Sequence, residues 1–187
     1  LLDLCAAPGS KTTHIAEVTN DSAFIVAGDL HHHRLKTVRS LSVLQGFSSV
    51  NCLTLDGLQP LPLPDNYFDR VLIDAPCSGT GTLRRNPEIR WRISTGDIED
   101  LAARQTKLLI NAARTVKNGG RLVYSTCSVE MEENERVRHT FLENSKDFRP
   151  LELDIDPSLK TEPGVARTWP HRQGSDGFFI SVFERLN

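Results

Sequence analysis

Two cysteines in this chain stand where a nucleophile would be useful. Cys77 ends the sequence DAPC and Cys127 ends the sequence STC, and each follows directly on a predicted strand. A thiolate is a strong nucleophile, and a second thiol beside it can hold or pass on a proton. A lone loop cysteine is usually inert, but two at equivalent strand ends favour a catalytic pair that faces one cleft.

A metal centre is the alternative interpretation of these thiols. Cys5 would be the third ligand of such a site, but neither a fourth ligand nor a CxxC spacing accompanies it. The run His31-His32-His33 does not help, because consecutive positions at the start of a helix do not converge on one ion. We therefore expect no metal, and a solvated turn at the histidines.

The segment DLCAAPGSKT, residues 3–12, leads from an apolar start through small residues into a predicted helix. Small residues let a ligand approach the backbone amides at a helix N-terminus. A phosphate-binding P-loop would have Gly where Ser10 stands, and the dinucleotide pattern GxGxxG is absent too. The segment predicts a ligand-binding turn of another kind, with a generic tight turn as the alternative.

Acidic residues end the next two predicted strands. Asp29 follows Phe24–Gly28, where a carboxylate can accept both ribose hydroxyls of an adenosine. Asp56 follows Asn51–Leu55 and could face an adenine amino group. Either one alone could be a solvated loop carboxylate, but their joint placement favours a nucleotide ligand.

The elements that must position these residues are short apolar runs that alternate with helix-like stretches. The expected strands are Leu1–Leu4, Phe24–Ala27, Val50–Leu55, Arg70–Ile73 and Arg121–Tyr124. The expected helices are Ser10 to near Val18, Leu35–Gln45 with Gly46 as the stop signal, and an Asp97-capped helix with an apolar stripe through Val116, ended by Gly119-Gly120. This alternation predicts an α/β fold with a mostly parallel, doubly wound sheet, in which strands one, four and five are neighbours.

The C-terminal part of the chain departs from the alternation. Phe148–Leu153 and Phe178–Phe183 are two strand-like runs separated by a loop rich in proline and glycine. They predict an antiparallel edge on the sheet.

Composition and length limit the class of protein. The chain has 187 residues, enough for one domain, with 25% charged and 39% hydrophobic residues, which is typical of globular proteins. A formal charge of −2 gives no general electrostatic case for nucleic-acid binding but allows a local basic groove. No apolar run approaches the ~20 residues that span a bilayer, and widely spaced cysteines fit a reducing cytoplasm. The chain starts inside a predicted strand without a Met, so we expect a preceding segment.

The motifs together resemble a known family. DLCAAPGSKT, DAPCSGTGTLRRNPEIRW, YSTCS and GSDGFFISVFER occur in the order found in the RsmB/NOL1/NOP2/Sun family of RNA cytosine-5 methyltransferases. The match covers nearly the whole chain, and Ser10 stands where the family often has Gly. The resemblance implies a Rossmann-like class I methyltransferase catalytic domain over residues 1–187, which acts on RNA with S-adenosylmethionine as cofactor. It is strongest for the bacterial branch that modifies 16S ribosomal RNA, and it implies a preceding RNA-recruiting region.

The resemblance also implies roles for residues. Cys127 corresponds to the nucleophile that adds to carbon 6 of cytosine, and Cys77 to the cysteine that assists product release. Asp74 lies by the methionine end and the cytosine, Lys11 reaches the target base, Asp29 takes the ribose and Asp56 the adenine side. The backbone that cradles the cofactor is formed by Cys5, Ala6, Ala7, Pro8, Gly9, Ser10 and Lys11.

The alternatives are the same chemistry on transfer RNA, a DNA cytosine methyltransferase, an NAD-dependent oxidoreductase, and a non-catalytic module for RNA assembly. Retention of both cysteines argues against the module, and the missing GxGxxG against the oxidoreductase. We expect a cytoplasmic monomer that needs neither metal nor membrane.

Three further segments lie near the motifs. Arg84, Arg85, Arg90 and Arg92 with Trp91 are suited to phosphate contact or base stacking, or form a solvated charged loop. The acidic sequence EENE, residues 132–135, predicts only an acidic first helical turn. The glycines of GSDG, residues 174–177, predict a turn near the cleft by resemblance alone.

Overall fold

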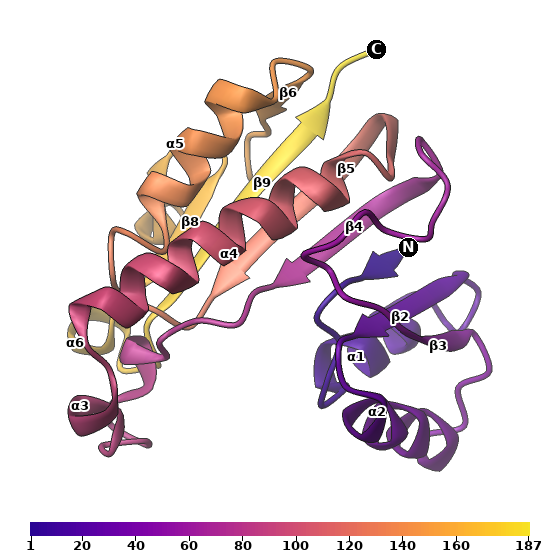
Figure 1. The fold of residues 1–187 in the computed structure, drawn as a ribbon, viewed down its shortest axis with the longest axis horizontal. Helices are drawn as coiled ribbons and strands as arrows, with labels where there is room; N and C mark the ends of the chain where they lie inside the picture. The colour runs from indigo at the N-terminus through magenta and orange to yellow at the C-terminus, as the bar shows by residue number, and fades with distance from the viewer.

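The computed structural model describes residues 1–187 as a single sheet with helices packed on it (Figure 1). The strands are β1 (Leu2–Asp3), β2 (Ile25–Asp29), β3 (Val50–Thr54), β4 (Phe68–Asp74), β5 (Val116–Thr126), β6 (Phe148–Pro150), β7 (Lys160–Glu162), β8 (Val165–Thr168) and β9 (Phe178–Arg185). The helices are α1 (Ser10–Val18), α2 (His32–Leu44), α3 (Ile89–Arg92), α4 (Thr95–Ala113), α5 (Glu135–Asn144) and α6 (Pro170–Gln173), with 3₁₀ turns at Thr80–Thr82 and Pro157–Leu159. None of the helices has the length and apolar character needed to cross a membrane.

The sheet is parallel in its N-terminal part and antiparallel after β5. Its strand order is β3-β2-β1-β4-β5-β9-β8-β7, with β6 paired to β9. The order confirms the prediction that β1, β4 and β5 are neighbours. Because parallel strands end on one edge of a sheet, the segments that follow β1, β2, β4 and β5 come together.

The two faces of the sheet carry separate apolar clusters, as a doubly wound sheet requires. Successive residues of β2 point to opposite faces. Val26 belongs to a cluster of 22 residues that includes Leu108 and Leu109 of α4. Ala27 belongs to a cluster of five residues that includes Leu35 and Val38 of α2. Figure 1 shows α4 and α5 side by side along β4, β5 and β9, with α1 and α2 near β2 and β3.

The prediction for the ends of α4 was wrong at both termini. Ser94 is the N-cap, and Asp97 is the third helical residue of a reciprocal capping box with it. The helix ends at Ala113, and Gly119-Gly120 lie inside β5. Val116 continues the helical apolar period, but it is a buried residue of β5 paired with Phe68 of β4. The apolar period of the helix therefore did not reveal where α4 ends, because the first residue of β5 falls at the position where the next apolar helical residue would stand.

The antiparallel edge was predicted correctly in kind but not in extent. β9 pairs antiparallel with β5, and the short β6 pairs with β9 at Phe148–Pro150. The loop between the two predicted strands contains β7 and β8, which extend the sheet beyond β9. β9 is therefore an interior strand, which explains its buried residues Phe179 and Phe183.

Candidate active site

A cavity of about 340 Å³ opens where the parallel strands end. This position is the one at which ligands bind in open α/β sheets, and the volume lies in the range of small-molecule sites. Its apolar wall includes Leu30, Leu55, Leu58 and Leu108. The predicted site residues that line the cavity are Cys5, Ala7, Asp29, Asp56, Asp74, Cys77 and Cys127.

Cys77 and Cys127 face one another at one end of this cavity. Their sulfur atoms lie 3.3 Å apart, within hydrogen-bond distance. Either thiol could be the donor in this contact. With Cys77 S–H as the donor, the contact lowers the pKa of Cys127 to about 7. The same contact raises the pKa of Cys77, and burial and the nearby negative charges of Cys127 and Glu133 raise it further. Cys127 is therefore the thiol that ionises near neutral pH, with Cys77 as its proton-bearing partner.

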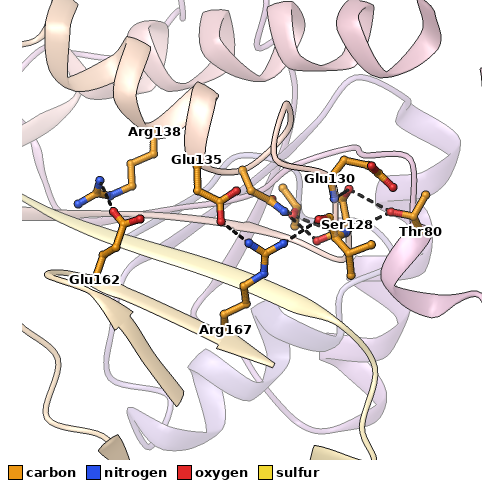
Figure 2. Close-up of polar contacts among 10 residues, drawn as sticks. Thr80, Ser128, Glu130, Glu135, Arg138, Glu162 and Arg167 are labelled. Atoms are coloured by element: carbon orange, nitrogen blue, oxygen red, sulfur yellow. Dashed lines mark hydrogen bonds and ion pairs between the residues drawn. The ribbon is translucent and has the colours of Figure 1, made fainter. Parts of the chain in front are cut away.

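The segment that follows β4 carries Cys77 and is called the Cys77 loop. Hydrogen bonds join it to the end of β5 and to the segment with Cys127, and they fix the distance between the two thiols. The Ala75 amide donates to the Ser125 carbonyl at 2.8 Å, and the Gly81 amide donates to the Cys127 carbonyl at 2.9 Å. Figure 2 shows Thr80 and Ser128 between the loops; the Thr80 and Ser128 hydroxyls lie 3.3 Å apart. A Cβ on Gly81 would lie 2.2 Å from the Gly177 carbonyl oxygen, so only glycine permits this packing.

Glu133 is a functional candidate that the sequence prediction missed. The prediction of an acidic first helical turn was wrong for this residue, because α5 begins at Glu135 and the Glu133 side chain is fully buried before it. One carboxylate oxygen accepts from the Ser78 amide at 2.9 Å and from Gln105 Nε2 at 2.8 Å. The other accepts from the Ser78 hydroxyl at 2.5 Å. The signal in the sequence was Gln105, a polar residue on the apolar stripe of α4 that needs a buried partner.

Lys11 and Asp74 form an ion pair beside the thiols. Lys11 Nζ lies 2.5 Å from Asp74 Oδ2, and the Ser125 hydroxyl donates to Asp74 Oδ1 at 2.7 Å. Lys11 also stands over the Phe178 ring, at 5.7 Å from its centroid. The structure thus brings α1, β4 and β5 together at one charged group, which leaves Asp74 fixed and Lys11 partly exposed.

Asp29 is held at the end of β2 with only 4% of its surface exposed. It accepts from the amides of Ala7 at 3.4 Å and His31 at 3.0 Å, and Arg34 lies 3.4 Å from Oδ2. Arg34 was not predicted, and it also donates to the Ala7 carbonyl. These contacts tie the predicted cofactor loop to the carboxylate.

Asp56 lies on the cavity wall but turns one oxygen toward its own loop. Asp56 Oδ1 accepts from the Leu58 amide at 2.9 Å. The neighbouring Gly57 packs so closely against Leu108 that a Cβ there would meet it at 2.5 Å. The loop after β3 is therefore fixed against α4.

The rest of the predicted cofactor loop supports the cavity instead of lining it. Ala6 is buried against α2, and Pro8 and Ser10 are exposed. Gly9 is the N-cap of α1 with φ +114°, and a Cβ there would lie 3.0 Å from Val38 Cα. Gly9 thus permits the sharp entry into α1 and the close approach of α2.

The basic stretch contacts the C-terminal turn. Arg85 forms an ion pair with Asp176, and Arg84 donates to the Gly174 carbonyl at 3.1 Å. The Gly177 amide donates to the Gly81 carbonyl at 2.9 Å, which places the GSDG turn beside the Cys77 loop. Trp91, with 79% of its surface exposed, stays free at the end of α3.

Arg167 of β8 contacts the segment that follows Cys127 (Figure 2). It donates to the Val129 carbonyl at 2.7 Å and forms an ion pair with Glu135. Its guanidinium stacks 4.0 Å from the centroid of the Trp169 ring. β8, a strand that the sequence did not predict, therefore stabilises the segment that follows Cys127.

Neither the histidine run nor the thiols form a metal cluster. The structure contains no group of three or more His, Cys, Asp or Glu side chains placed to hold an ion. His32 begins α2, and His31 and His33 stack on each other at 5.4 Å. Burial raises the pKa of Cys5 to about 12, so this third cysteine remains a thiol.

The antiparallel strand β9 lies beside β5, and the cavity lies at the carboxyl ends of the parallel strands. These two features define a Rossmann-like fold of the class I methyltransferase type. A family model described as 16S rRNA methyltransferase RsmB/F matches residues 1–184, and the chain belongs to this family.

Individual relatives agree with this assignment. The chain is 42% identical over 194 residues to "Probable ribosomal RNA small subunit methyltransferase B" of Synechocystis sp., covering 99% of this chain and 43% of that protein. The crystal structure of PH0851 is 40% identical with a TM-score of 0.92 over 98% of this chain and 42% of that one. The structure of NSun6 from Pyrococcus horikoshii with SFG is 30% identical with a TM-score of 0.85, over 100% of this chain and 47% of that one. The chain thus spans less than half the length of these relatives.

Proposed function

We propose that this chain is the catalytic domain of an enzyme that transfers a methyl group from S-adenosylmethionine to carbon 5 of a cytosine in RNA. The observation that carries the proposal is the pair of facing thiols, 3.3 Å apart, in the lining of a cavity of about 340 Å³. The two thiols have unequal acidities, which suits one to attack and the other to manage a proton.

The volume and lining of the cavity support an adenosine-containing cofactor. Asp29 at the end of β2 would accept the ribose hydroxyls, and the leucine-rich wall would receive an adenine with Asp56 at its edge. The backbone from Cys5 to Lys11 and the Asp74 carboxylate would hold the methionine end. The relative NSun6 has been solved with SFG, an analogue of S-adenosylmethionine, which supports the same ligand here. The bound cofactor supplies an electrophilic methyl group.

Cys127 begins the reaction by adding its thiolate to carbon 6 of the cytosine. The addition converts the ring to an enamine, so that carbon 5 becomes nucleophilic and takes the methyl group. Cys77, which carries a proton before the reaction, then assists release as a relay: its thiol gives that proton to the departing Cys127 sulfur and takes the proton from carbon 5. The electrons of that C–H bond restore the C5=C6 double bond and expel the Cys127 sulfur.

Asp74 and Lys11 would hydrogen-bond the pyrimidine during addition. Charge that develops on the ring would be stabilised by this fixed ion pair, which Ser125 already orients. The base must reach the cavity unpaired, either flipped from a helix or in a single strand. Trp91 and the exposed arginines beside it would contact the flanking RNA.

Ribosomal RNA is the proposed substrate, because the family model and the Synechocystis relative carry that activity in their names. The test is methyl transfer to total RNA by the full-length protein, followed by mapping of 5-methylcytosine. We expect modification of 16S ribosomal RNA, abolished by Cys127→Ala and kept by Cys52→Ala, since Cys52 is exposed on β3. If only transfer RNA is modified, the proposed substrate is wrong and transfer RNA takes its place. If the protein binds the cofactor but modifies no RNA, a non-catalytic module is favoured.

A further inference from the structure

The two thiols meet symmetrically, so the contact between their sulfur atoms does not itself decide which one ionises. Either atom could be the donor across the 3.3 Å between them. The difference must come from the surroundings of each thiol. The charged and titratable groups that face the pair from the neighbouring elements are Lys11 of α1, Asp74 of β4, Arg104 of α4, Tyr124 of β5, Cys5 after β1 and Glu133 before α5.

Glu133 is a buried charge on the Cys77 side. All three of its side-chain partners are neutral donors: the Ser78 amide, the Ser78 hydroxyl and Gln105 Nε2. An ionised carboxylate is an acceptor only, and this set of donors matches that state. Two of the donors belong to Ser78, the residue next to Cys77, so the charge is fixed beside that thiol.

The Cys127 side is different. There the ion pair of Lys11 and Asp74 presents both signs of charge, at 2.5 Å from each other. Negative charge next to a thiol opposes its ionisation, and low solvent exposure strengthens the effect. The buried Glu133 carboxylate therefore disfavours ionisation of Cys77. Near Cys127 the negative charge of Asp74 is balanced by Lys11, so ionisation of Cys127 is opposed less.

Gln105 and Tyr124 make Glu133 the junction of three elements. Gln105 Nε2 also donates to the Pro76 carbonyl at 2.9 Å, which ties α4 to the Cys77 loop. The Tyr124 hydroxyl donates to the Glu133 carbonyl at 2.6 Å, which ties β5 to the same residue. The carboxylate thus has a fixed position relative to both thiols.

We propose that Glu133 is a positioning residue that holds the Cys77 loop and, by its buried negative charge, keeps Cys77 protonated so that Cys127 is the thiolate. The inference rests on the proposed function for its catalytic meaning, but its effect on the two thiols can be measured without RNA or cofactor. The ordering of the two thiols would then be a property of the folded protein alone.

The test is iodoacetamide alkylation of the full-length protein, resolved for each cysteine by peptide mass spectrometry over neutral to alkaline pH. In the natural protein Cys127 should react at lower pH than Cys77. Glu133→Gln is the decisive variant: its amide oxygen can accept from Ser78 N and Gln105, and its NH₂ group can donate to the Ser78 hydroxyl. The substitution removes the charge and retains the contacts.

The variant is made in a Cys127→Ser background, so that the reagent cannot first block the neighbouring thiol. Loss of the charge should make Cys77 alkylation about tenfold faster at a fixed pH, the change that one pKa unit produces. The midpoint of the pH profile should fall, whereas mere loosening of the loop would raise only the plateau at high pH. Glu132→Gln is the matched control, because Glu132 pairs with Arg136. It should change nothing.

An unchanged Cys77 midpoint in the Glu133→Gln variant would overturn the proposal. So would alkylation of Cys77 before Cys127 in the natural protein, a measurement that decides the matter even if the variant does not fold. A shifted midpoint together with no methylation of RNA would leave the inference standing and remove the proposed function.

Discussion

The sulfur atoms of Cys77 and Cys127 lie 3.3 Å apart although 50 residues separate the two cysteines in the chain. At this distance two thiolates would repel each other, so the pair carries one proton between them when the first thiol ionises. The arrangement gives the protein one thiolate and one protonated thiol from two identical side chains.

The division of labour between the cysteines can be tested by trapping the adduct. With cognate RNA and S-adenosylmethionine, full-length Cys77→Ala should form a covalent RNA complex, because Cys127 can attack but release is impaired. Cys127→Ala should form none. Denaturing gel electrophoresis separates the complex from free protein. The reverse pattern would mean that the roles of the two cysteines are exchanged.

The pH dependence of Cys127 reports the hydrogen bond from Cys77. Its pKa of about 7 lies below the usual value of 9, so alkylation of Cys127 should rise through neutral pH and level off above it. Cys77→Ala removes the donor and leaves the burial, so the pKa of Cys127 should rise and its alkylation midpoint should move to higher pH. Peptide-resolved alkylation measures this shift. A midpoint unchanged in Cys77→Ala would exclude the hydrogen bond as its cause.

Cofactor affinity should depend on Asp29. Asp29→Asn should weaken S-adenosylmethionine binding by about 1–3 kcal/mol, because a buried ribose would lose a charged acceptor. Isothermal titration calorimetry measures the difference. Asp65→Asn is the control, since Asp65 lies in an exposed loop and pairs with Arg114 away from the cavity. Equal affinities for a folded Asp29→Asn and the natural protein would remove Asp29 from the site.

The stability of the fold should depend on the buried face of α4. Leu109 has no exposed surface, whereas its neighbour Ile110 is 39% exposed. Leu109→Ala should lower the free energy of unfolding by about 2–5 kcal/mol, because it leaves a cavity in the larger cluster. Ile110→Ala should cost much less. Urea unfolding compares the two variants, and similar losses of unfolding free energy for both would contradict the burial of Leu109 in the core.

The positions of the two cysteines were predictable because strand ends are predictable. Short apolar runs alternate with helical periods, and parallel strands bring their carboxyl ends to one edge. Sequence alone therefore placed Cys77 and Cys127 in one cleft, together with Asp29, Asp56 and Asp74. The family motifs added the chemical roles, which spacing by itself does not specify.

The extent of the C-terminal sheet was not predictable from local patterns. β7 and β8 are three and four residues long, and they lie in what the composition marks as a loop. β8 is stabilised by pairing with β9, and β7 by pairing with β8, so neither strand is marked by its own sequence pattern alone. Likewise, Val116 continues the apolar period of α4 but belongs to β5, because it pairs with Phe68 of β4.

Glu133 marks the boundary between what the sequence determined and what only the tertiary structure decided. The sequence determined the alternating α/β order and the residues at the strand ends, since both depend on patterns of neighbouring residues. Gln105 indicated that a buried polar partner exists, but nothing in the sequence identified that partner as Glu133, which is buried while Glu132 and Glu135 are partly exposed. The donors that make this burial favourable lie 55 and 28 residues away in the chain. A buried charge depends on its partners, and only the folded structure brings those partners together.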